Sequence, residues 1–517
     1  MINKIGREIP DEILKQYGKE GYQGPNYRDN VRYKKAAPMV RGVVDPKQDK
    51  MVSNIREALE KCKIQDGMVL SFHHHFRDGD YVVNMVMAEV AAMGIRDITI
   101  CASSLGAAHD PIAEYIEQGI VTGIQSSGVR GKIGEAISRG KLKTPAIIRS
   151  HGGRVRAIEE GDVHIDIAFI GAPTSDAYGN ARGVGGKSDC GVLSYSMVDA
   201  QYADNVVVIT DCLVPFPNFP ASISMTNVDY VCVVDEIGNP DKIISNAIRM
   251  TKDVRELMMA KYCTRLIADS PYFQDGFSFQ TGAGGASLAV NTMLRPIMEE
   301  KNIHMGFSIG GITQPICEML KDGLVRNIVD AQCFDRASIE SIKNDARHFE
   351  ISTSEYANPM NKGTFANKLD FVILGALEVD IDYNVNVVTG SDGIVRGAPG
   401  GHPDIAAGSK CSIIIAPLVR GRIPTICDRV VTAVTPGETV DIIVTDYGIA
   451  INPRRTDLIE AYKNTHLPFC TIEELRDMAY EIVGTPDEIP FKDRVVGIIE
   501  NRDGTILDVV RELDEEC

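Results

Sequence analysis

Hydrophobic and polar residues alternate along this chain in blocks that predict helices and strands in turn. The first fifty residues are polar and rich in Lys, Arg, Tyr and Pro, which is typical of an arm rather than of a core element. From there the pattern predicts helices over Met51–Lys63 and Tyr81–Met93, and strands over Met68–Phe72 and Asp97–Cys101. Strands that alternate with helices of this length indicate βαβ units, so we predict an α/β fold with mainly parallel sheets.

The second half of the chain repeats much of the first half. Ile165–Ala172 (IDIAFIGA) returns 204 residues later as Leu369–Ala376 (LDFVILGA), and Ser104-Leu105-Gly106 returns at the same offset as Ser308-Ile309-Gly310. A constant offset shared by separated segments indicates duplication. We therefore predict two homologous domains related by a pseudo-twofold axis.

The repeat also predicts domain limits. We expect an arm over residues 1–50, a first domain over 51–250 and a second domain over 251–517, with the boundary in the polar helical stretch Asn239–Lys261. Pockets form preferentially where domains meet, so we favour one site shared by both halves. The alternative is two independent domains, one of them an inactive copy.

Composition narrows the class of protein. The 517 residues are 44% hydrophobic and 24% charged, with a formal net charge of -17, which disfavours nucleic acid as a partner. Met1–Pro10 has no apolar core and no apolar run is long enough to span a bilayer, so we expect neither a signal peptide nor membrane insertion. The twelve cysteines include no CxxC pair, so we expect reduced thiols in a cytoplasm and no metal.

A glycine loop, Gln280–Ser287, separates an apolar strand from a helical run. Its glycines 282, 284 and 285 would let backbone N–H groups approach a phosphate, a pantetheine amide or a thioester oxygen at a helix N-terminus. The spacing matches neither a dinucleotide fingerprint nor a Walker loop. A tight strand-to-helix turn without a ligand is the alternative.

Two basic loops are candidate anion sites. His73, His74 and Arg77 follow the strand Met68–Phe72, and Arg149 and Arg154 follow an apolar strand over Ala146–Ile148. Arginine can grip a carboxylate bidentately, so these loops suit a polycarboxylate. A solvated polar turn is the alternative for each, and zinc is the least favoured interpretation of the histidines.

A third glycine loop, Gly397–Asp404, carries Gly400, Gly401 and Asp404 in a GG-x-x-D spacing that Gly185–Asp189 repeats in the first half. Its backbone donors could stabilise a developing oxyanion. The alternative is a turn capped by an Asx side chain.

These segments together resemble a known family. Leu369–Asp380, the loop Gly397–Asp404 and the strand Val440–Asp446 resemble the second half of the CoA-transferase superfamily. The loops Ser71–Asp80 and Thr281–Ser287 are similar to those of citrate lyase α subunits. The resemblance to this family extends over nearly the whole chain. The resemblance implies two CoA-transferase-type (NagB/RpiA-like) domains.

The resemblance also implies a reaction: acetyl-thioester plus citrate gives citryl-thioester plus acetate. The thioester would come from acetyl-CoA or from the CoA-like prosthetic group of an acyl carrier protein, the γ subunit, with no tightly bound cofactor. A β subunit would then cleave the citryl-thioester. We also expect self-association into a homo-oligomer.

One departure from the superfamily concerns its usual catalytic glutamate, which is expected near His304–Gly311, where this chain has no acid. We therefore predict direct attack by a citrate carboxylate and a mixed anhydride instead of an acyl-enzyme. Ser308, Gly400 and Gly401 are the predicted catalytic positions. The predicted citrate ligands are His73, His74, Arg77, Arg149 and Arg154, and the predicted thioester ligands are Gly282, Gly284, Gly285, Gly397 and Asp404.

Three other interpretations stay open at this point. The chain could be a CoA-transferase for another carboxylate, a non-catalytic ligand-binding regulator on the same fold, or a scaffold of a lyase complex.

Overall fold

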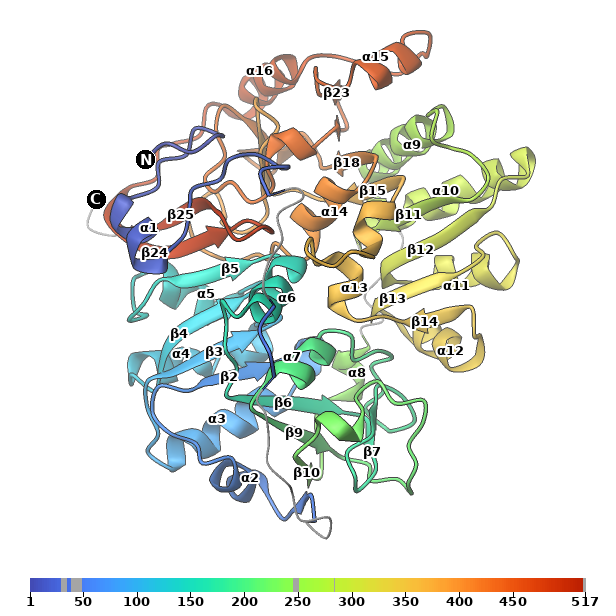
Figure 1. The fold of residues 1–517 in the computed structure, drawn as a ribbon. Coiled ribbons are helices and arrows are strands. Elements are labelled where there is room, and N and C mark those ends of the chain that lie inside the picture. Colours follow the sequence, from blue (N-terminus) through green and yellow to red (C-terminus); the bar gives the residue numbers. More distant parts are fainter. Residues whose placement is uncertain (29–34, 39–48, 245–250, 283, 515–517) are drawn as a thin grey trace.

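A computed structural model describes residues 1–28, 35–38, 49–244, 251–282 and 284–514 (Figure 1). Parts of the predicted arm, residues 245–250 of the predicted boundary, Ala283 and Cys517 lie outside the described residues. Among the described helices, none combines the length and the apolar character that crossing a membrane requires.

The first half is built on a ten-stranded sheet in the order β1-β10-β9-β6-β2-β3-β4-β5-β24-β25. Its strands are β1 (Met51–Val52), β2 (Val69–Phe72), β3 (Ile98–Ala102), β4 (Val121–Ser126), β5 (Ala146–Arg149), β6 (Ile167–Ala172), β9 (Asn205–Thr210), β10 (Tyr230–Val233), β24 (Phe491–Glu500) and β25 (Ile506–Leu513). Every residue of β6 is buried, as expected for a parallel strand covered on both faces.

The second half has an eight-stranded sheet in the order β14-β13-β12-β11-β15-β18-β22-β23. Its strands are β11 (Phe277–Thr281), β12 (Met305–Ile312), β13 (Ile328–Cys333), β14 (His348–Glu350), β15 (Phe371–Leu374), β18 (Cys411–Ile415), β22 (Ile442–Val444) and β23 (Ile449–Ile451). All neighbours pair in parallel except β22 and β23.

The two sheets share one strand order. The run β10-β9-β6-β2-β3-β4-β5 in the first corresponds, position by position and in chain order, to β22-β18-β15-β11-β12-β13-β14 in the second. This correspondence confirms the α/β fold with two homologous halves and mainly parallel sheets. The pseudo-twofold axis stays a prediction.

Helices cover the sheets and fill the space where the halves meet. The first half has α2 (Ile55–Lys61), α3 (Val82–Ala92), α4 (Ile112–Glu117), α5 (Gly131–Ser138), α6 (His151–Glu160), α7 (Ser196–Tyr202) and α8 (Pro240–Ile243). The second has α9 (Val254–Ala268), α10 (Gly285–Lys301), α11 (Gln314–Lys321), α12 (Arg336–Asn344), α13 (Thr353–Ala357), α14 (His402–Gly408), α15 (Thr456–Tyr462) and α16 (Ile472–Val483). Helices α6, α13 and α14 lie between the two sheets (Figure 1).

The C-terminal hairpin corrects the predicted domain limits. Strands β24 and β25 belong to the first sheet, where β24 runs parallel to β5, although both lie within the predicted second domain, 251–517. The physical reason is the open edge of β5, whose backbone groups need a partner. The start of the predicted helix Met51–Lys63 is also wrong, because Met51–Val52 forms strand β1.

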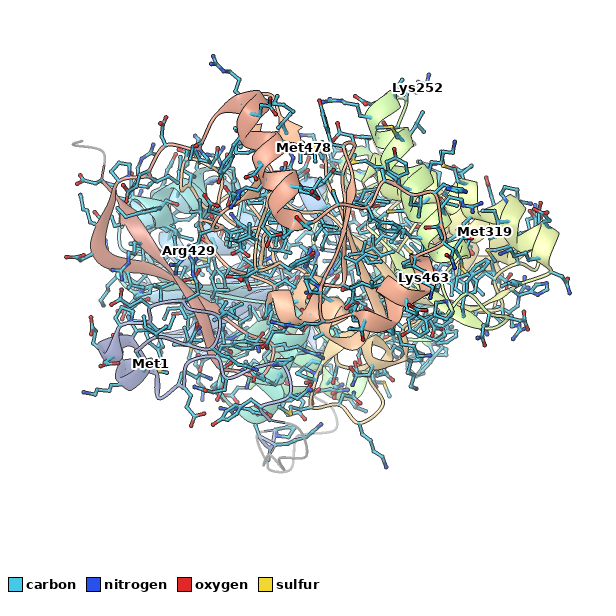
Figure 2. All side chains as sticks on the ribbon, turned by 90° about the horizontal axis from the view of Figure 1, so that it is seen from above. Met1, Lys252, Met319, Arg429, Lys463 and Met478 are labelled. Carbon is cyan, nitrogen blue, oxygen red and sulfur yellow. The ribbon has the colours of Figure 1, made fainter. Side chains whose placement is uncertain are left out.

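The N-terminal arm packs on this hairpin. Helix α1 (Asp11–Tyr17) buries Ile13 against Ile498 and Ile506, and the Asn3 side chain donates a hydrogen bond of 2.8 Å to the Leu507 carbonyl. Figure 2 places Met1 and Arg429 on the same side of the molecule, and the Arg429 guanidinium donates to the Gly6 carbonyl at 3.0 Å. The described part of the arm therefore ties the hairpin to the second half.

Candidate active site between the two halves

The glycine loop Gly397–Asp404 of the second half lies against loops of the first. The Gly400 carbonyl accepts a hydrogen bond of 2.7 Å from the His151 N–H, and the Gly400 N–H donates to the Ser127 carbonyl at 3.1 Å. Gly400 has φ +53°, which favours glycine. Loops at the carboxyl ends of parallel strands thus meet here, which is where α/β folds of this kind bind ligands.

Asp404 holds the first turn of α6, which carries His151. Its two carboxylate oxygens accept hydrogen bonds from Ser150 Oγ at 2.7 Å and from the Gly152 N–H at 2.8 Å. Ser150 is also the N-cap of α6 and accepts from the Gly153 N–H at 2.9 Å. Burial raises the pKa of Asp404 to about 6. Asp404, a predicted thioester ligand, is therefore engaged in positioning α6.

Two neutral imidazoles form the centre of the site. The rings of His74 and His151 stack with centroids 5.4 Å apart, and the Tyr195 ring lies 4.4 Å from His74 and 4.7 Å from His151. Burial holds the pKa of His74 well below its usual value and lowers that of His151 to about 3. His74 Nδ1 lies 2.6 Å from Ser103 Oγ, whereas the buried Nδ1 of His151 has no hydrogen-bond partner in the part of the chain that the structure describes. A neutral imidazole with a free nitrogen can bind a polar ligand group.

Arg77 reaches from the first half to the second. Its guanidinium donates to the Phe334 carbonyl at 3.1 Å and lies over the Phe334 ring, 5.2 Å from the centroid. In the described parts of the chain, no carboxylate lies within ion-pair distance of it. A cation that no ion pair holds, at the junction of the halves, suits an anionic ligand.

His73 and Arg154 are engaged with a carboxylate inside the first half. His73 Nε2 lies 3.0 Å from Asp199, and Arg154 donates to both oxygens of Asp199, at 2.9 and 2.6 Å. All three side chains are buried. A buried cation needs such a partner, so these contacts are evidence against the predicted role of His73 and Arg154 as citrate ligands.

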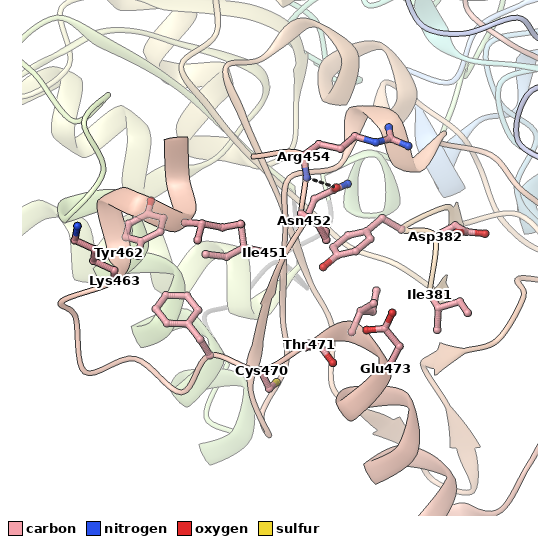
Figure 3. Close-up of a pocket in the computed structure, with 15 residues that line it drawn as sticks. Ile381, Asp382, Ile451, Asn452, Arg454, Tyr462, Lys463, Cys470, Thr471 and Glu473 are labelled. Carbon is pink, nitrogen blue, oxygen red and sulfur yellow. Dashed lines mark hydrogen bonds between the residues drawn. The ribbon is translucent and has the colours of Figure 1, made fainter. Parts of the chain in front are cut away.

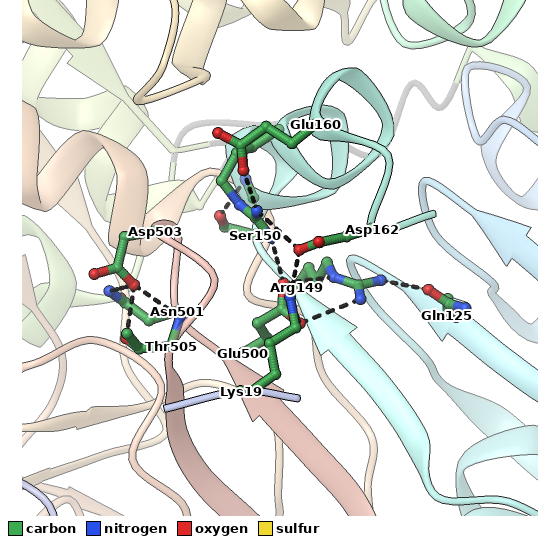
Figure 4. A network of polar contacts seen from close by, with 12 residues as sticks. Lys19, Gln125, Arg149, Ser150, Glu160, Asp162, Glu500, Asn501, Asp503 and Thr505 are labelled. Atoms are coloured by element: carbon green, nitrogen blue, oxygen red, sulfur yellow. Dashed lines mark hydrogen bonds and ion pairs between the residues drawn. The ribbon is translucent and has the colours of Figure 1, made fainter. Parts of the chain in front are cut away.

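Arg149 is also paired. It donates to Glu500 at 2.8 and 3.2 Å, and Glu500 accepts a further bond of 2.7 Å from Arg156 (Figure 4). Figure 4 shows Lys19 and Asp162 at the border of the same network. The partner carboxylate comes from the C-terminal hairpin, which explains why the sequence around Arg149 resembles a free anion loop.

The loop around Gly282 lies at the end of β11, where α10 begins. The Gly282 N–H donates to the Ile373 carbonyl at 3.2 Å, and Gly284 is the N-cap of α10. Two residues before Gly282, Gln280 donates to Tyr356 Oη at 2.9 Å, while its buried Oε1 has no partner among the described residues. A Cβ at Gly401 would lie 2.6 Å from Tyr356 Oη. Tyr356 therefore links the two glycine loops of the second half.

Ser308 lies inside strand β12 rather than at its end. It is buried, and its N–H donates to the Asn327 carbonyl at 3.1 Å. In strand β14 of the second half, Glu350 accepts hydrogen bonds from the Leu193 N–H and from Ser222 Oγ of the first half. Burial raises the pKa of Glu350 to about 7. Its oxygens therefore join the halves.

Asp330, Cys333 and His348 are close enough to hold a metal ion, with ligand atoms within 4.8 Å of one another. Asp330 accepts hydrogen bonds from Cys333 Sγ at 2.9 Å and from His348 at 3.0 Å. These bonds account for the arrangement of all three side chains.

A pocket of about 680 Å³ lies elsewhere in the second half, between α15, α16 and the loop after β23 (Figure 3). Its lining is mainly apolar, with Arg454 and Lys463 among the polar residues, and none of the predicted site residues lines it.

Four groups at the site are not among the predicted residues: His151, Tyr195, Gln280 and Tyr356. His151 stands between Arg149 and Arg154, in a predicted anion loop of which only the arginines are predicted ligands. No motif marks Tyr195, which only the fold brings to the two imidazoles.

The chain is similar to known proteins over most of its length. Residues 48–513 match the family described as citrate lyase, alpha subunit (CitF). The citrate lyase alpha chain of Haemophilus influenzae is 49% identical over 469 residues, 91% of this chain and 94% of that protein. A crystal structure described as the alpha subunit of citrate lyase in complex with citrate, from Streptococcus mutans, is 52% identical, with a TM-score of 0.96 over 99% of this chain and 100% of that one. The malonate decarboxylase alpha subunit of Acinetobacter baumannii, 16% identical with a TM-score of 0.62 over 84% of each chain, shares the fold. This chain therefore belongs to the citrate lyase α-subunit family.

Proposed function

We propose that this chain transfers an acyl-carrier thioester from acetyl to citrate at the site between its halves. One observation carries the proposal: loops of both halves bring together the stacked His74–His151 pair, the glycine loop at Gly400 and Arg77, which forms no ion pair with the described carboxylates. Family membership and the Streptococcus mutans relative, described in complex with citrate, support the choice of substrate.

The reaction needs no covalent enzyme intermediate. A citrate carboxylate oxygen attacks the carbonyl carbon of the acetyl-thioester, the carbon–sulfur bond breaks, and the thiolate leaves with the electron pair. The thiolate then attacks the citryl carbonyl of the mixed anhydride, and acetate leaves. The chain has to hold the two reactants together and stabilise two oxyanions.

The residues divide into three roles. Arg77 binds a citrate carboxylate, and the neutral imidazoles of His74 and His151 donate N–H groups toward the reacting oxygens. The Gly401 amide is the oxyanion donor that we favour, because the Gly400 N–H already bonds Ser127. The glycines 282, 284 and 285 hold the thioester arm at the N-terminus of α10.

The remaining predicted residues support these groups. Asp404 and Arg154 hold elements in place through Ser150 and Asp199. Gly397 brings its loop to the first half, since its carbonyl accepts from the Val129 N–H at 3.0 Å. Ser308 stays a predicted catalytic position that no contact supports.

The thioester is supplied from outside the chain. Acetyl-CoA or the CoA-like prosthetic group of an acyl carrier protein brings it, and a β subunit cleaves the citryl-thioester product. A cytoplasmic location and self-association stay predictions from sequence.

An exchange assay on the purified chain tests the proposal. Acetyl-CoA and citrate should give citryl-CoA and acetate in equal amounts, measured by mass spectrometry. Binding of acetyl-CoA with no acyl exchange would favour a non-catalytic regulator or a scaffold, and exchange with another carboxylate only would favour a different CoA-transferase.

A further inference from the structure

Arg130 lies at the junction of the halves, outside the predicted site residues. It follows β4 and is the N-cap residue of α5. Its N–H donates to the Leu105 carbonyl at 3.0 Å, and the N–H of the preceding residue, Val129, donates to the Gly397 carbonyl at 3.0 Å. The backbone at Arg130 is therefore fixed between a first-half loop and the second-half glycine loop.

The same loops bring Arg130 toward Arg77 and His74. Leu105 pairs with Val129, and a Cβ on the next residue, Gly106, would lie 3.1 Å from an oxygen of Asp78, the neighbour of Arg77. Burial and two nearby histidines are the largest causes that lower the pKa of His74, and the charges of Arg130 and Arg77 lower it further. Burial is the main cause that lowers the pKa of Arg77; the charge of Arg130 lowers it further, whereas the charge of Asp78 raises it. Two guanidinium groups thus act on one neutral imidazole.

Neither guanidinium forms an ion pair within the described residues, although the charges of Asp78 and Asp335 act on Arg77. Arg130 is exposed, and in the ranges that the structure describes no carboxylate forms an ion pair with it or with Arg77. Arg149 and Arg154, by contrast, are each paired with a buried carboxylate. Two like charges that act on each other without an ion-pair partner repel each other, and a bound anion removes that repulsion.

We infer that Arg130, together with Arg77, binds a carboxylate of citrate that is not the one transferred, and so selects a polycarboxylate over a monocarboxylate. Guanidinium groups bind carboxylates with paired N–H donors, which suits this task. The inference rests on the proposed transferase function, and it adds a specificity-determining residue to it.

The test compares Arg130→Ala and Arg130→Lys with Lys132→Ala. Lys132 is an exposed cation two residues along the chain, so its replacement by Ala removes the same charge. We expect Arg130→Ala to raise the KM for citrate and the calorimetric Kd of citrate by about tenfold or more, with the KM for acetyl-CoA unchanged. Arg130→Lys should lose less, and Lys132→Ala should match the wild type. Exchange of labelled acetate into acetyl-CoA, which involves no second carboxylate, should keep its wild-type rate in Arg130→Ala.

Each other outcome is decisive. Wild-type citrate binding in Arg130→Ala would overturn the inference, and so would an equal loss in Lys132→Ala or an equal loss of acetate exchange. A wild-type chain that binds citrate without forming citryl-CoA would refute the proposed function. Loss of that binding in Arg130→Ala would still support the arginine site.

Discussion

Asp404 and Ser150 stand 254 residues apart in the chain, and their side chains join at 2.7 Å between the two halves. Through this bond a carboxylate of the second half holds the first turn of the helix that carries His151. The site therefore depends on how the halves are joined as much as on the residues within either half.

Replacing Asp404 by Asn should reduce stability and activity together. The change leaves one of the Ser150 and Gly152 donors without an acceptor, at a cost of about 1–3 kcal/mol in the free energy of unfolding. The turn that carries His151 then loosens, so kcat should fall. Denaturant unfolding and the exchange assay measure the two effects. Full activity in a destabilised variant would show that α6 needs no such support.

The same variant should also reveal the titration of Asp404. Burial raises its pKa from 3.8 to about 6, so between these values the folded protein binds more protons than the unfolded chain. The stability of the wild type relative to Asp404→Asn should therefore fall as pH rises through this range, by up to about 3 kcal/mol. A difference between the two unfolding free energies that is constant with pH would contradict this assignment.

The stacked imidazoles should titrate far below their usual range. Burial lowers the pKa of His151 to about 3, against 6.5 for a free imidazole. The unfolded chain binds the extra proton, so stability due to this group is complete above pH 6.5 and is lost as pH falls. We expect a kcat profile that is flat through about pH 6.5, and a His151→Asn variant that is slow at every pH. A kcat that falls with a pKa near 6.5, absent in His151→Asn, would show that the ring is charged.

Replacement by Ala should affect different properties at Arg77 and at Arg149. Removing Arg149 leaves Glu500 buried with one cation fewer, so the free energy of unfolding should fall by about 3–5 kcal/mol. Removing Arg77 should mainly raise the KM for citrate. If Arg149→Ala keeps its stability and loses citrate affinity, the original sequence prediction for Arg149 is correct.

Gly401 and Tyr356 offer a test of the glycine loop by paired variants. A Cβ at position 401 would lie 2.6 Å from the Tyr356 hydroxyl oxygen and 3.2 Å from its nearest ring carbon. Gly401→Ala should therefore displace the loop and lower kcat, and Tyr356→Phe in the same chain should restore part of it because the closest atom is gone. A double variant no better than Gly401→Ala would place the defect elsewhere.

The duplicated fold could be predicted because the sequence repeat extends over whole strands, as β6 and β15 show. The loops of the site could be predicted because basic and glycine-rich segments follow those strands. The sequence could not predict which arginines are paired with a carboxylate and which are left to bind a ligand. The counter-charge of Arg149 lies 351 residues away at Glu500, on a hairpin whose strand pattern does not say which sheet it joins.

The central claim is direct transfer between acetyl-thioester and citrate, and a single-turnover experiment with enzyme in excess tests it most directly. Citrate labelled with ¹⁸O in its carboxylates is mixed with acetyl-CoA, and the mass of the acetate that forms is measured by mass spectrometry. In the proposed reaction the bridging oxygen of the anhydride comes from citrate and leaves with acetate, so the acetate should carry one ¹⁸O. Unlabelled acetate, with the label in a glutamate of the chain, would contradict the account.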